Sequence, residues 1–419
     1  MHHAVSARPA LSAATLLLVA CEPHQSIQPL ELESPAPRAA STYFPPSEAE
    51  GGWRKRTTAA QIRAVGLVAE KLDALGRYLV SQPYENYQTG VSGYKPSNKA
   101  AIVVKDGWIV GEYYNQSGAE RALYYLASNG KSLAILLTGH MMQGHPELGL
   151  DAGSKLYDRR WLPEGFSLTD PGKSAITFDQ VFRHQSGIVP EDAHQIASSA
   201  VQTEADWSFE PFTVGKDARW PQSARLWYTP GKPGTYDGRT YSSVAFNHFS
   251  LIFENVSGME ASEYLKHAIF APIRVGRVGY KMTTGMGTTK WAAAGNGLMA
   301  ARDFMRVGYL MLREGSWNGR RIFPASWLRR FTESTAYPNL RSNRDCYWGA
   351  EYPADLYRTT GSGQNWVLVV PSLDLLLTYN GRTPASRKAE IDRESLRRLF
   401  AAVTERYVAC DGTVANAGG

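Results

Sequence analysis

Apolar side chains recur at helical spacing near both ends of the predicted folded region. One predicted helical face near the N-terminus is formed by Ile62, Val65, Leu72, Leu75 and Leu79. A second stripe predicts the last helix and is formed by Leu396, Leu399, Phe400, Val403 and Tyr407. Each stripe is a face that must be buried against another element.

Short apolar runs predict two pairs of strands. Residues 102–104 and 108–110 flank Asp106-Gly107, which favours a two-residue hairpin turn because Gly accepts positive φ without penalty. Residues 366–370 and 375–379 form a second pair around a turn-like segment. Since the middle of the chain is mostly helical in pattern, we predict an α+β fold. It would be an antiparallel sheet flanked by the N- and C-terminal helices, with an inserted helical subdomain.

Composition narrows the classes of function. The chain has 419 residues, of which 43% are hydrophobic and 20% charged, as in ordinary globular proteins. Its net charge of +6 is small for this length, and its tight basic cluster, residues 54–56, has no interleaved aromatic side chains. We therefore expect no nucleic-acid partner. His140, His145 and His194 lack the spacing of a metal site, so no metal is expected.

The N-terminus predicts export. Residues 10–20 form an apolar run of signal-peptide length, too short to span a bilayer as a helix. The run ends in Leu-Val-Ala-Cys at Cys21, which looks like a bacterial lipoprotein cleavage box. This resemblance implies a lipid anchor on Cys21 and a place in the cell envelope, facing the periplasm or on the outer membrane. A plain secretory signal with a coincidental cysteine is the alternative.

Proline content and cysteine count complete the organisation. The predicted segments are a signal peptide (1–21), a proline-rich tether (22–56), a folded domain (57–410) and a disordered tail (411–419). If Cys21 carries lipid, Cys346 and Cys410 remain as one even pair in an oxidising compartment, which predicts a disulfide. Two unrelated buried thiols are the alternative.

A Ser-x-x-Lys motif, Ser128 to Lys131, opens an apolar run. Residues three apart share a helix face, so the Lys131 ammonium can reach the Ser128 hydroxyl. A helix N-terminus also presents free N–H groups and partial positive charge, which favour the oxyanion of acyl transfer. Because residues 133–137 are apolar nearly all round, the helix should be buried, and burial favours a neutral lysine.

A second copy of the motif lies at Ser92 and Lys95 and runs straight into Pro96. The residue before a proline is steered away from helix. We therefore interpret this copy as a coincidence in a loop.

Three further segments follow Ser128 along the chain: residues 182–187 (Phe-Arg-His-Gln-Ser-Gly), 241–243 (Tyr-Ser-Ser) and 359–361 (Thr-Thr-Gly). In this order the motifs resemble those of the serine β-lactamase and D,D-peptidase superfamily, most closely the class C-related, family VIII esterase branch. The resemblance covers about residues 59–408. It implies a β-lactamase/transpeptidase-like fold.

The resemblance also implies roles for individual residues. Ser128 would be the nucleophile, Lys131 its proton partner, and Tyr241 the base for attack and the acid for the leaving group. Backbone N–H groups of Ser128 and Ser362 would form the oxyanion hole. The implied substrate-binding residues are Ser243, Thr359, Thr360 and Gly361. No metal or organic cofactor is required.

Two departures from the family pattern bear on the substrate. Ser243 stands where the family often has Asn, although Tyr-x-Ser also occurs in the branch that cleaves linear amides. Thr359 stands where β-lactamases have the lysine that meets the substrate carboxylate. Strand alternation would turn the neighbouring Arg358 to the opposite face. The alternative is that Arg358, or an arginine from elsewhere in the chain, reaches the cleft and replaces the missing lysine.

Two other side chains have simpler interpretations. His184 is expected to be a structural turn residue that bonds to the backbone, rather than a catalytic base. Trp366 is expected in the core, whereas Trp348 is the better candidate for a cleft wall.

These observations predict a serine hydrolase that acts on a small ester or amide, with esterase-type activity first. The alternatives within the enzyme class are a D,D-peptidase or D-aminopeptidase, a hydrolase of linear amides such as aminohexanoate oligomers, and a class C β-lactamase. From another class comes a non-catalytic module that binds peptidoglycan fragments or β-lactams. Intact Ser128, Lys131 and Tyr241 count against that module.

Overall fold

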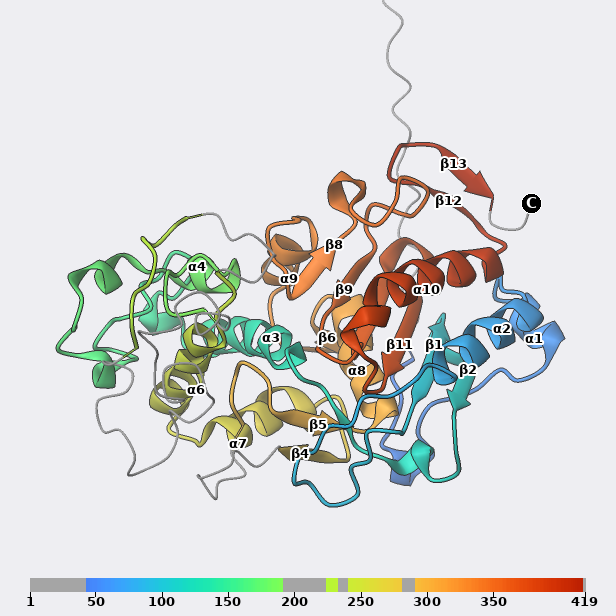
Figure 1. Ribbon diagram of the computed structural model, residues 1–419, viewed down its shortest axis with the longest axis horizontal. Coiled ribbons are helices and arrows are strands. Elements are labelled where there is room, and N and C mark those ends of the chain that lie inside the picture. The colour runs from blue at the N-terminus through green and yellow to red at the C-terminus, as the bar shows by residue number, and fades with distance from the viewer. Residues whose placement is uncertain (1–42, 191–223, 233–239, 281–290, 417–419) are drawn as a thin grey trace, which may run out of the picture. The chain divides into compact units, whose positions relative to one another are not determined.

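The computed structural model describes residues 43–190, 224–232, 240–280 and 291–416 (Figure 1). The predicted signal peptide, Cys21, residues 22–42 of the predicted tether, and His194 lie outside these described residues. Among the described residues, no helix is both long and apolar enough to cross a bilayer.

The described helices are α1 (Ala59–Arg63), α2 (Ala69–Val80), α3 (Asn129–Gly144), α4 (Phe178–Phe182), α6 (Ser243–Ser257), α7 (Ala261–Leu265), α8 (Ala301–Leu312), α9 (Ala325–Thr332) and α10 (Lys388–Ala402). The longer strands are β1 (Ala100–Lys105), β2 (Trp108–Tyr114), β10 (Trp366–Val370) and β11 (Leu375–Asn380). The shorter strands are β3 (Tyr124–Tyr125), β4 (Val278–Tyr280), β5 (Gly297–Met299), β6 (Ser316–Trp317), β7 (Arg320–Arg321), β8 (Leu340–Ser342), β9 (Tyr357–Thr359), β12 (Arg406–Val408) and β13 (Val414–Asn416).

The main sheet has the strand order β2-β1-β11-β10-β9-β8, and every neighbouring pair is antiparallel. Both predicted hairpins are present. The β1–β2 turn has Asp106 and Gly107 at φ 51° and 74°, the left-handed geometry that a two-residue hairpin turn needs. The first and last parts of the chain meet where β1 pairs with β11, with Val103 opposite Leu377.

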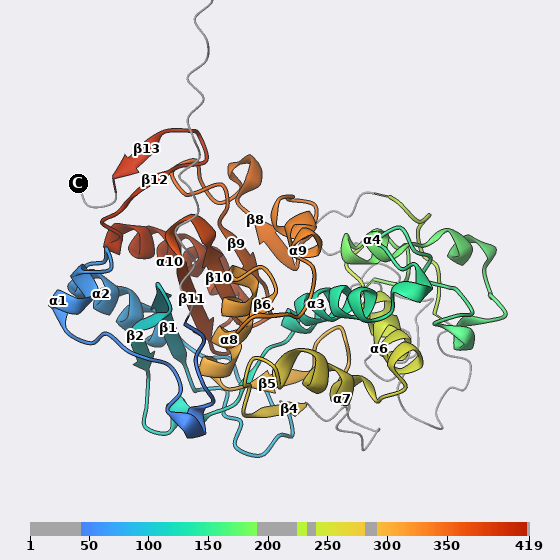
Figure 2. The same ribbon diagram turned by 180° about the vertical axis from the view of Figure 1, so that it is seen from behind.

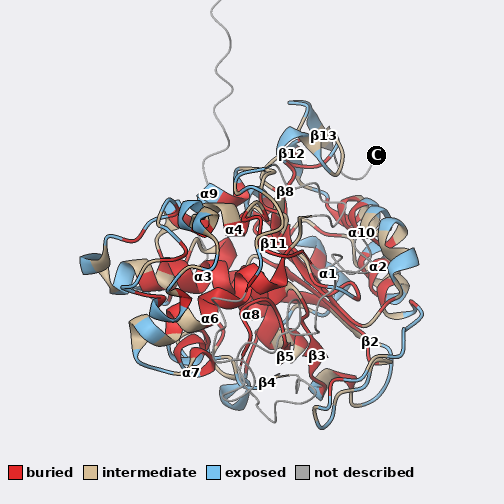
Figure 3. Cartoon of the chain, turned by 60° about the vertical axis from the view of Figure 1, so that its left-hand side comes forward, coloured by how far each residue is buried: buried red, intermediate tan, exposed pale blue. Residues whose placement is uncertain are grey.

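Alternation along the strands divides the core between two faces of the sheet. Ala101 and Val103 pack with residues of α2 and α10 on one face, which Figure 1 shows covered by these two helices. Ile102 and Val104 point to the other face, where the larger cluster includes residues of α3, α6 and α8. Figure 3 shows α3 and α8 as buried. The terminal helices therefore cover only one face, and α8 from the middle of the chain covers the other.

The helical part lies to one side of this sheet. Helices α4 and α6 gather there in both ribbon views (Figure 1 and Figure 2). Their interface is aromatic, with Phe182 stacked on Phe249 at 5.0 Å between ring centroids. The inserted helical subdomain that the hydrophobic pattern predicts is therefore present.

The terminal helices differ from the prediction in where they begin and end. The N-terminal stripe is divided between two helices, α1 and α2. Gly66 at φ 76° interrupts the helical conformation, and Leu67 forms a β-bridge with Val403. That bridge also removes Val403 from the last helix, which ends at Ala402. Tyr407 lies in β12 instead. The apolar spacing continues through both sites, so the stripe alone overestimates each helix.

The tether prediction is wrong for residues 43–56, which pack on the folded domain. Trp53 is only 3% exposed, and Tyr309 of α8 donates a hydrogen bond of 2.8 Å to the carbonyl of Tyr43. The fully buried guanidinium of Arg306, also on α8, donates to the carbonyl of Pro45 at 2.8 Å and pairs with Glu48. A buried cation needs such acceptors, and this segment supplies them.

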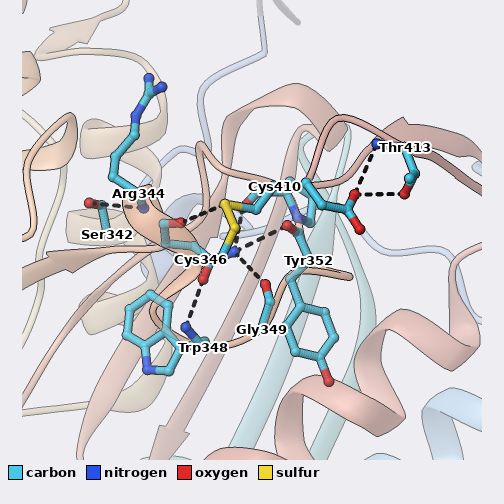
Figure 4. Close-up of a disulfide and its surroundings, with 11 residues drawn as sticks. Ser342, Arg344, Cys346, Trp348, Gly349, Tyr352, Cys410 and Thr413 are labelled. Atoms are coloured by element: carbon cyan, nitrogen blue, oxygen red, sulfur yellow. Dashed lines mark hydrogen bonds between the residues drawn. A yellow bond between two sulfur atoms is a disulfide. The ribbon is translucent and has the colours of Figure 1, made fainter.

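The disordered-tail prediction is likewise wrong for residues 411–416. Strand β13 pairs with β12, placing Val414 opposite Val408. Residues 417–419 lie outside the described part. As predicted, Cys346 and Cys410 form a disulfide with 5.5 Å between their Cα atoms, and Figure 4 shows the bond joining the segment after β8 to the C-terminal hairpin.

Candidate active site

Ser128 lies at the N-cap of α3, and Lys131 follows it one turn later. The Lys131 side chain is fully buried, and its Nζ lies 3.3 Å from Ser128 Oγ. The same nitrogen lies 2.8 Å from Ser243 Oγ and 3.0 Å from the carbonyl oxygen of Ala294. A carbonyl can only accept, so one N–H of Lys131 is committed to Ala294. The other two contacts connect the lysine to the hydroxyls of Ser128 and Ser243.

The start of α3 is held against the segment 291–296 by two glycines. A Cβ on Gly130 would lie 2.4 Å from the Cα of Gly295, and a Cβ on Gly295 would lie 2.0 Å from the carbonyl oxygen of Ala127. The two backbones can approach only because both residues lack side chains. Ala127 itself has φ 48°, a left-handed conformation that costs a non-glycine residue about 1–2 kcal/mol. The strained turn immediately precedes Ser128.

Tyr241 and Ser243 reach Lys131 from the start of α6. The ring centroid of Tyr241 is 4.7 Å from Lys131 Nζ, a cation–π distance. Ser242 between them is the N-cap of α6 and accepts a hydrogen bond from the N–H of Ala245. This cap places residues 241 and 243 on the side of the helix start that faces α3.

The third motif touches the residues on both sides of Ser128. A Cβ on Gly361 would lie 2.2 Å from the carbonyl oxygen of Leu126 and 2.3 Å from Asn129 Nδ2, so only glycine fits there. Asn129 Nδ2 donates to the carbonyls of Leu126 at 2.6 Å and of Asn365 at 2.8 Å. These bonds tie the N-terminus of α3 to the loop between β9 and β10.

The backbone N–H groups of Ser128 and Ser362 are available as anion donors. Neither amide donates a hydrogen bond to another residue within the described ranges. One belongs to the start of α3, where the helix dipole is positive, and the other follows Gly361. Donors of this kind at the start of a helix are a place where a ligand oxygen can bind.

Comparison with known proteins agrees with this geometry. The model of the β-lactamase family matches residues 88–400, which is most of the sequence. The chain belongs to the β-lactamase family. Its fold is the antiparallel sheet and helices of that family of serine hydrolases.

Several solved structures share this fold. One is a penicillin-binding protein homologue from Caulobacter crescentus, with TM-score 0.55, 15% identity, and coverage of 78% of this chain and 98% of that one. Another is a family VIII carboxylesterase, with TM-score 0.55, 14% identity, and coverage of 78% and 97%. A third is a Bacillus anthracis protein assigned as a 6-aminohexanoate-dimer hydrolase, with TM-score 0.53, 17% identity, and coverage of 72% and 78%. At such identities the structures show the fold alone.

In this β-lactamase-family chain the predicted substrate-binding residues lie in different environments. Gly361 lies at the site, and Thr360 follows β9 with a half-buried side chain. The buried Thr359 hydroxyl accepts a hydrogen bond of 3.1 Å from the N–H of Val367, so it is engaged within the sheet. Ser243, predicted to bind substrate, contacts Lys131.

The cations near the third motif also divide. Arg358 points to the face covered by α10 and pairs with Asp392 at 2.6 Å, as strand alternation predicts. Arg382, which follows β11, donates to Ser362 Oγ at 3.1 Å and pairs with Glu85 at 3.1 Å. An arginine from elsewhere therefore reaches the third motif, in contact with the candidate oxyanion-hole residue.

The tryptophan predictions have opposite outcomes. Trp366 is buried in the core, as predicted. Trp348 packs against the cluster under α10 and lies near Arg358, with the Arg358 Cζ 5.3 Å from its ring. It lies on the sheet face away from Lys131, so the cleft-wall prediction is wrong. Trp348 lies in the segment between β8 and β9, and loop residues carry no face pattern that could have shown this.

Sequence reasoning missed several polar residues that assemble the site. Asn247 and Ser250 of α6 accept hydrogen bonds from the N–H groups of Ala294 and Ala293, which positions the carbonyl that binds Lys131. Asn339, just before β8, donates to the Tyr241 hydroxyl oxygen at 3.3 Å. Asn247 lies four residues after Ser243, one turn further along α6, and that spacing is the only signal that could have found it.

Proposed function

We propose that the protein is a serine hydrolase that cleaves a small ester or amide through an acyl-enzyme on Ser128, with esterase-type activity first. The observation that carries the proposal is the Lys131 amine, fully buried and 3.3 Å from Ser128 Oγ at the start of α3. The buried amine contacts the Ser128 and Ser243 hydroxyls and the Ala294 carbonyl oxygen, so it is placed to orient the attacking hydroxyl. Family membership supports the same reaction class.

In the proposed reaction, Ser128 Oγ attacks the carbonyl carbon while its proton passes to the ionised Tyr241 oxygen. The carbonyl oxygen becomes an oxyanion that accepts hydrogen bonds from the N–H groups of Ser128 and Ser362. Tyr241 then returns the proton to the departing alkoxide or amine, which leaves an ester on Ser128. Water repeats the sequence and releases the acid. Lys131 stabilises the ionised tyrosine and steers the Ser128 hydroxyl.

Substrate class rests on the third motif. Thr359 replaces the family lysine and its hydroxyl bonds the sheet, and Arg358 faces away, so neither offers a cation to a substrate carboxylate. A neutral ester needs no such cation. Esters also need less protonation of the leaving group than amides. We therefore expect p-nitrophenyl butyrate to be hydrolysed with a higher kcat/KM than nitrocefin. A clear preference for nitrocefin would contradict the esterase proposal.

The second candidate is hydrolysis of a carboxylate-bearing substrate, such as a β-lactam or a D,D-peptide, and Arg382 favours it. Its guanidinium contacts Ser362 and is 12% exposed. A charge-assisted hydrogen bond contributes roughly 1.5–3 kcal/mol, or about one to two decades in affinity. If this candidate holds, Arg382→Gln raises KM for nitrocefin by about 10-fold or more and leaves p-nitrophenyl butyrate nearly unaffected. Equal effects on both substrates would exclude a carboxylate-binding role.

A non-catalytic binding module is separated from both candidates by covalent labelling. A fluorophosphonate should label the wild-type protein, and mass spectrometry of the digest should locate the adduct on Ser128. A binding module would take up a β-lactam reversibly and leave no adduct after denaturation.

We also propose that the chain is exported and anchored through a lipid on Cys21, at the periplasmic or outer surface. Support comes from the apolar run before Cys21 and from the Cys346–Cys410 disulfide, which is typical of oxidising compartments. Mass spectrometry of the protein from membranes tests the anchor, with an N-terminus at lipid-modified Cys21 expected. Cleavage elsewhere without lipid would contradict it.

Joint replacement of both paired cysteines by serine should lower stability by up to about 4 kcal/mol, given their separation of 64 residues.

A further inference from the structure

Two buried polar side chains lie against Tyr241 and have no role in the steps above. His184 is 3% exposed and Asn339 is 2% exposed. The His184 ring stacks on the Tyr241 ring, with centroids 3.9 Å apart and planes 23° from parallel. Asn339 Nδ2 lies 3.3 Å from the Tyr241 oxygen, and Asn339 Oδ1 lies 2.9 Å from His184 Nε2. The three side chains form a continuous hydrogen-bonded group, and its Tyr241 ring lies against Lys131.

The direction of each hydrogen bond follows from one backbone amide. The N–H of Ser242, which can only donate, points at His184 Nδ1 at 3.1 Å, so Nδ1 is the unprotonated nitrogen. Burial, with the nearby charge of Lys131, lowers the pKa of His184 to about 3, so the ring is neutral. Its single proton is on Nε2 and is donated to Asn339 Oδ1. The Asn339 amide must then turn its NH₂ group toward the Tyr241 oxygen.

Both ends of this group are anchored to elements that carry the site. Ser242 is fixed as the N-cap of α6 by its bond from the Ala245 N–H and by donating to the carbonyl of Val189 at 2.8 Å. At the other end, Ser132 of α3 donates to the backbone carbonyl of Asn339 at 2.6 Å. The hydrogen-bonded group thus connects the starts of α3 and α6, where Ser128 and Tyr241 lie.

We propose that Asn339 is a further catalytic residue, which donates a hydrogen bond to the reacting oxygen of Tyr241, and that His184 is a positioning residue that holds the Asn339 amide in its donor orientation. This inference rests on the proposed function, because Tyr241 is the base in that reaction. A donor aimed at a phenolic oxygen stabilises its ionised form and is unable to take its proton. The titratable groups against Tyr241 include Lys131 from α3 and His184 from the segment after α4. Because His184 stays neutral, it adds no charge that would change with pH near neutrality.

The decisive variant is Asn339→Leu, which removes the donor, keeps similar volume and retains the backbone carbonyl that Ser132 needs. We expect kcat/KM for p-nitrophenyl butyrate to fall about 10- to 100-fold, as for loss of a hydrogen bond to a charged group. The acidic limb of the pH profile should move about 1–2 pH units upward. His184→Phe keeps an aromatic ring against Tyr241 but leaves the amide unheld, and should move the limb in the same direction by less.

The matched control is Asn343→Leu. Asn343 is also fully buried and donates to the carbonyls of Gly349 and Tyr352, away from Tyr241. Its loss should lower the melting temperature without moving the acidic limb. If the Asn339 and His184 variants fold, as judged by circular dichroism, and neither moves the limb, the inference is overturned.

A readout without turnover separates this inference from the proposed function. The ultraviolet absorbance of tyrosinate, taken as the difference between a protein and its Tyr241→Phe counterpart, reports ionisation of Tyr241 directly. In the Asn339→Leu background this ionisation should require higher pH by the same 1–2 units, roughly. An inactive wild type with this shift intact would contradict the hydrolase proposal and leave the hydrogen bond supported. An active wild type without the shift would overturn the inference alone.

Discussion

The chain carries the same four-residue motif twice, and the two copies differ in everything except their sequence pattern. Ser128 and Lys131 lie at the start of α3, with Lys131 fully buried and bonded to Ser128, Ser243 and Ala294. Ser92 and Lys95 lie in a turn before β1, and both side chains are exposed. The loop interpretation of the second copy is confirmed.

The comparison shows what a Ser-x-x-Lys pattern needs before it can be a catalytic site. A helix must bring the two side chains to one face, and a second element must remove the lysine from water. At Lys131 the second element is the start of α6 together with segment 291–296. Lys95 has neither, because it lies outside any helix and its side chain is exposed.

Replacing the serine of each copy by alanine should give the largest difference in activity between the two copies. Ser128→Ala should reduce hydrolysis of p-nitrophenyl butyrate by about 10⁴-fold or more and abolish fluorophosphonate labelling. Ser92→Ala should leave both unchanged, since its hydroxyl is exposed in a turn. An active Ser128 variant with a dead Ser92 variant would reverse the assignment of the site.

Replacing the lysine of each copy by methionine should give the next largest difference in activity. Lys131→Met keeps the length of the side chain but removes the amine that contacts Ser128 Oγ, and kcat should fall about 10³-fold. Lys95→Met should be neutral in kcat and in melting temperature. Steady-state kinetics on both variants tests this, and comparable kcat values would mean that Lys131 is a structural residue.

The glycines between serine and lysine should give the smallest and most specific difference. Gly130→Ala places a methyl group 2.4 Å from the Gly295 backbone and should lower stability by about 1–3 kcal/mol, with a fall of about 10-fold in kcat/KM as α3 shifts. Gly93→Ala has open space around it but keeps φ 80°, so it should cost about 1–2 kcal/mol in strain alone. Thermal melts should then show two destabilised proteins, of which only the Gly130 variant loses activity. Full activity in that variant would show that the close approach is dispensable.

Periodicity and motif order were sufficient for the framework of the fold. They predicted both hairpins, the buried helix after Ser128 and the antiparallel sheet, and the cysteine count predicted the disulfide. Two sets of misplaced boundaries lie where long-range contacts override a local pattern. Leu67 and Val403 leave their predicted helices to bridge each other. Residues 43–56 are ordered rather than a polar tether, because their carbonyl groups and Glu48 bind the buried Arg306, which is distant in sequence.

The sequence by itself determined the candidate chemistry: Ser128, Lys131 and Tyr241 carry functional groups whose type and order already indicate acyl transfer. Only the tertiary structure decided what surrounds them. It brought Ser243 and Ala294 to the Lys131 amine, Asn339 to the Tyr241 oxygen, and Arg382 to Ser362. Hydrogen bonds act over about 3 Å, whereas these partners are separated by tens to hundreds of residues, so no local pattern encodes them. They become neighbours only once the sheet has paired its first and last strands and the helices have packed against it.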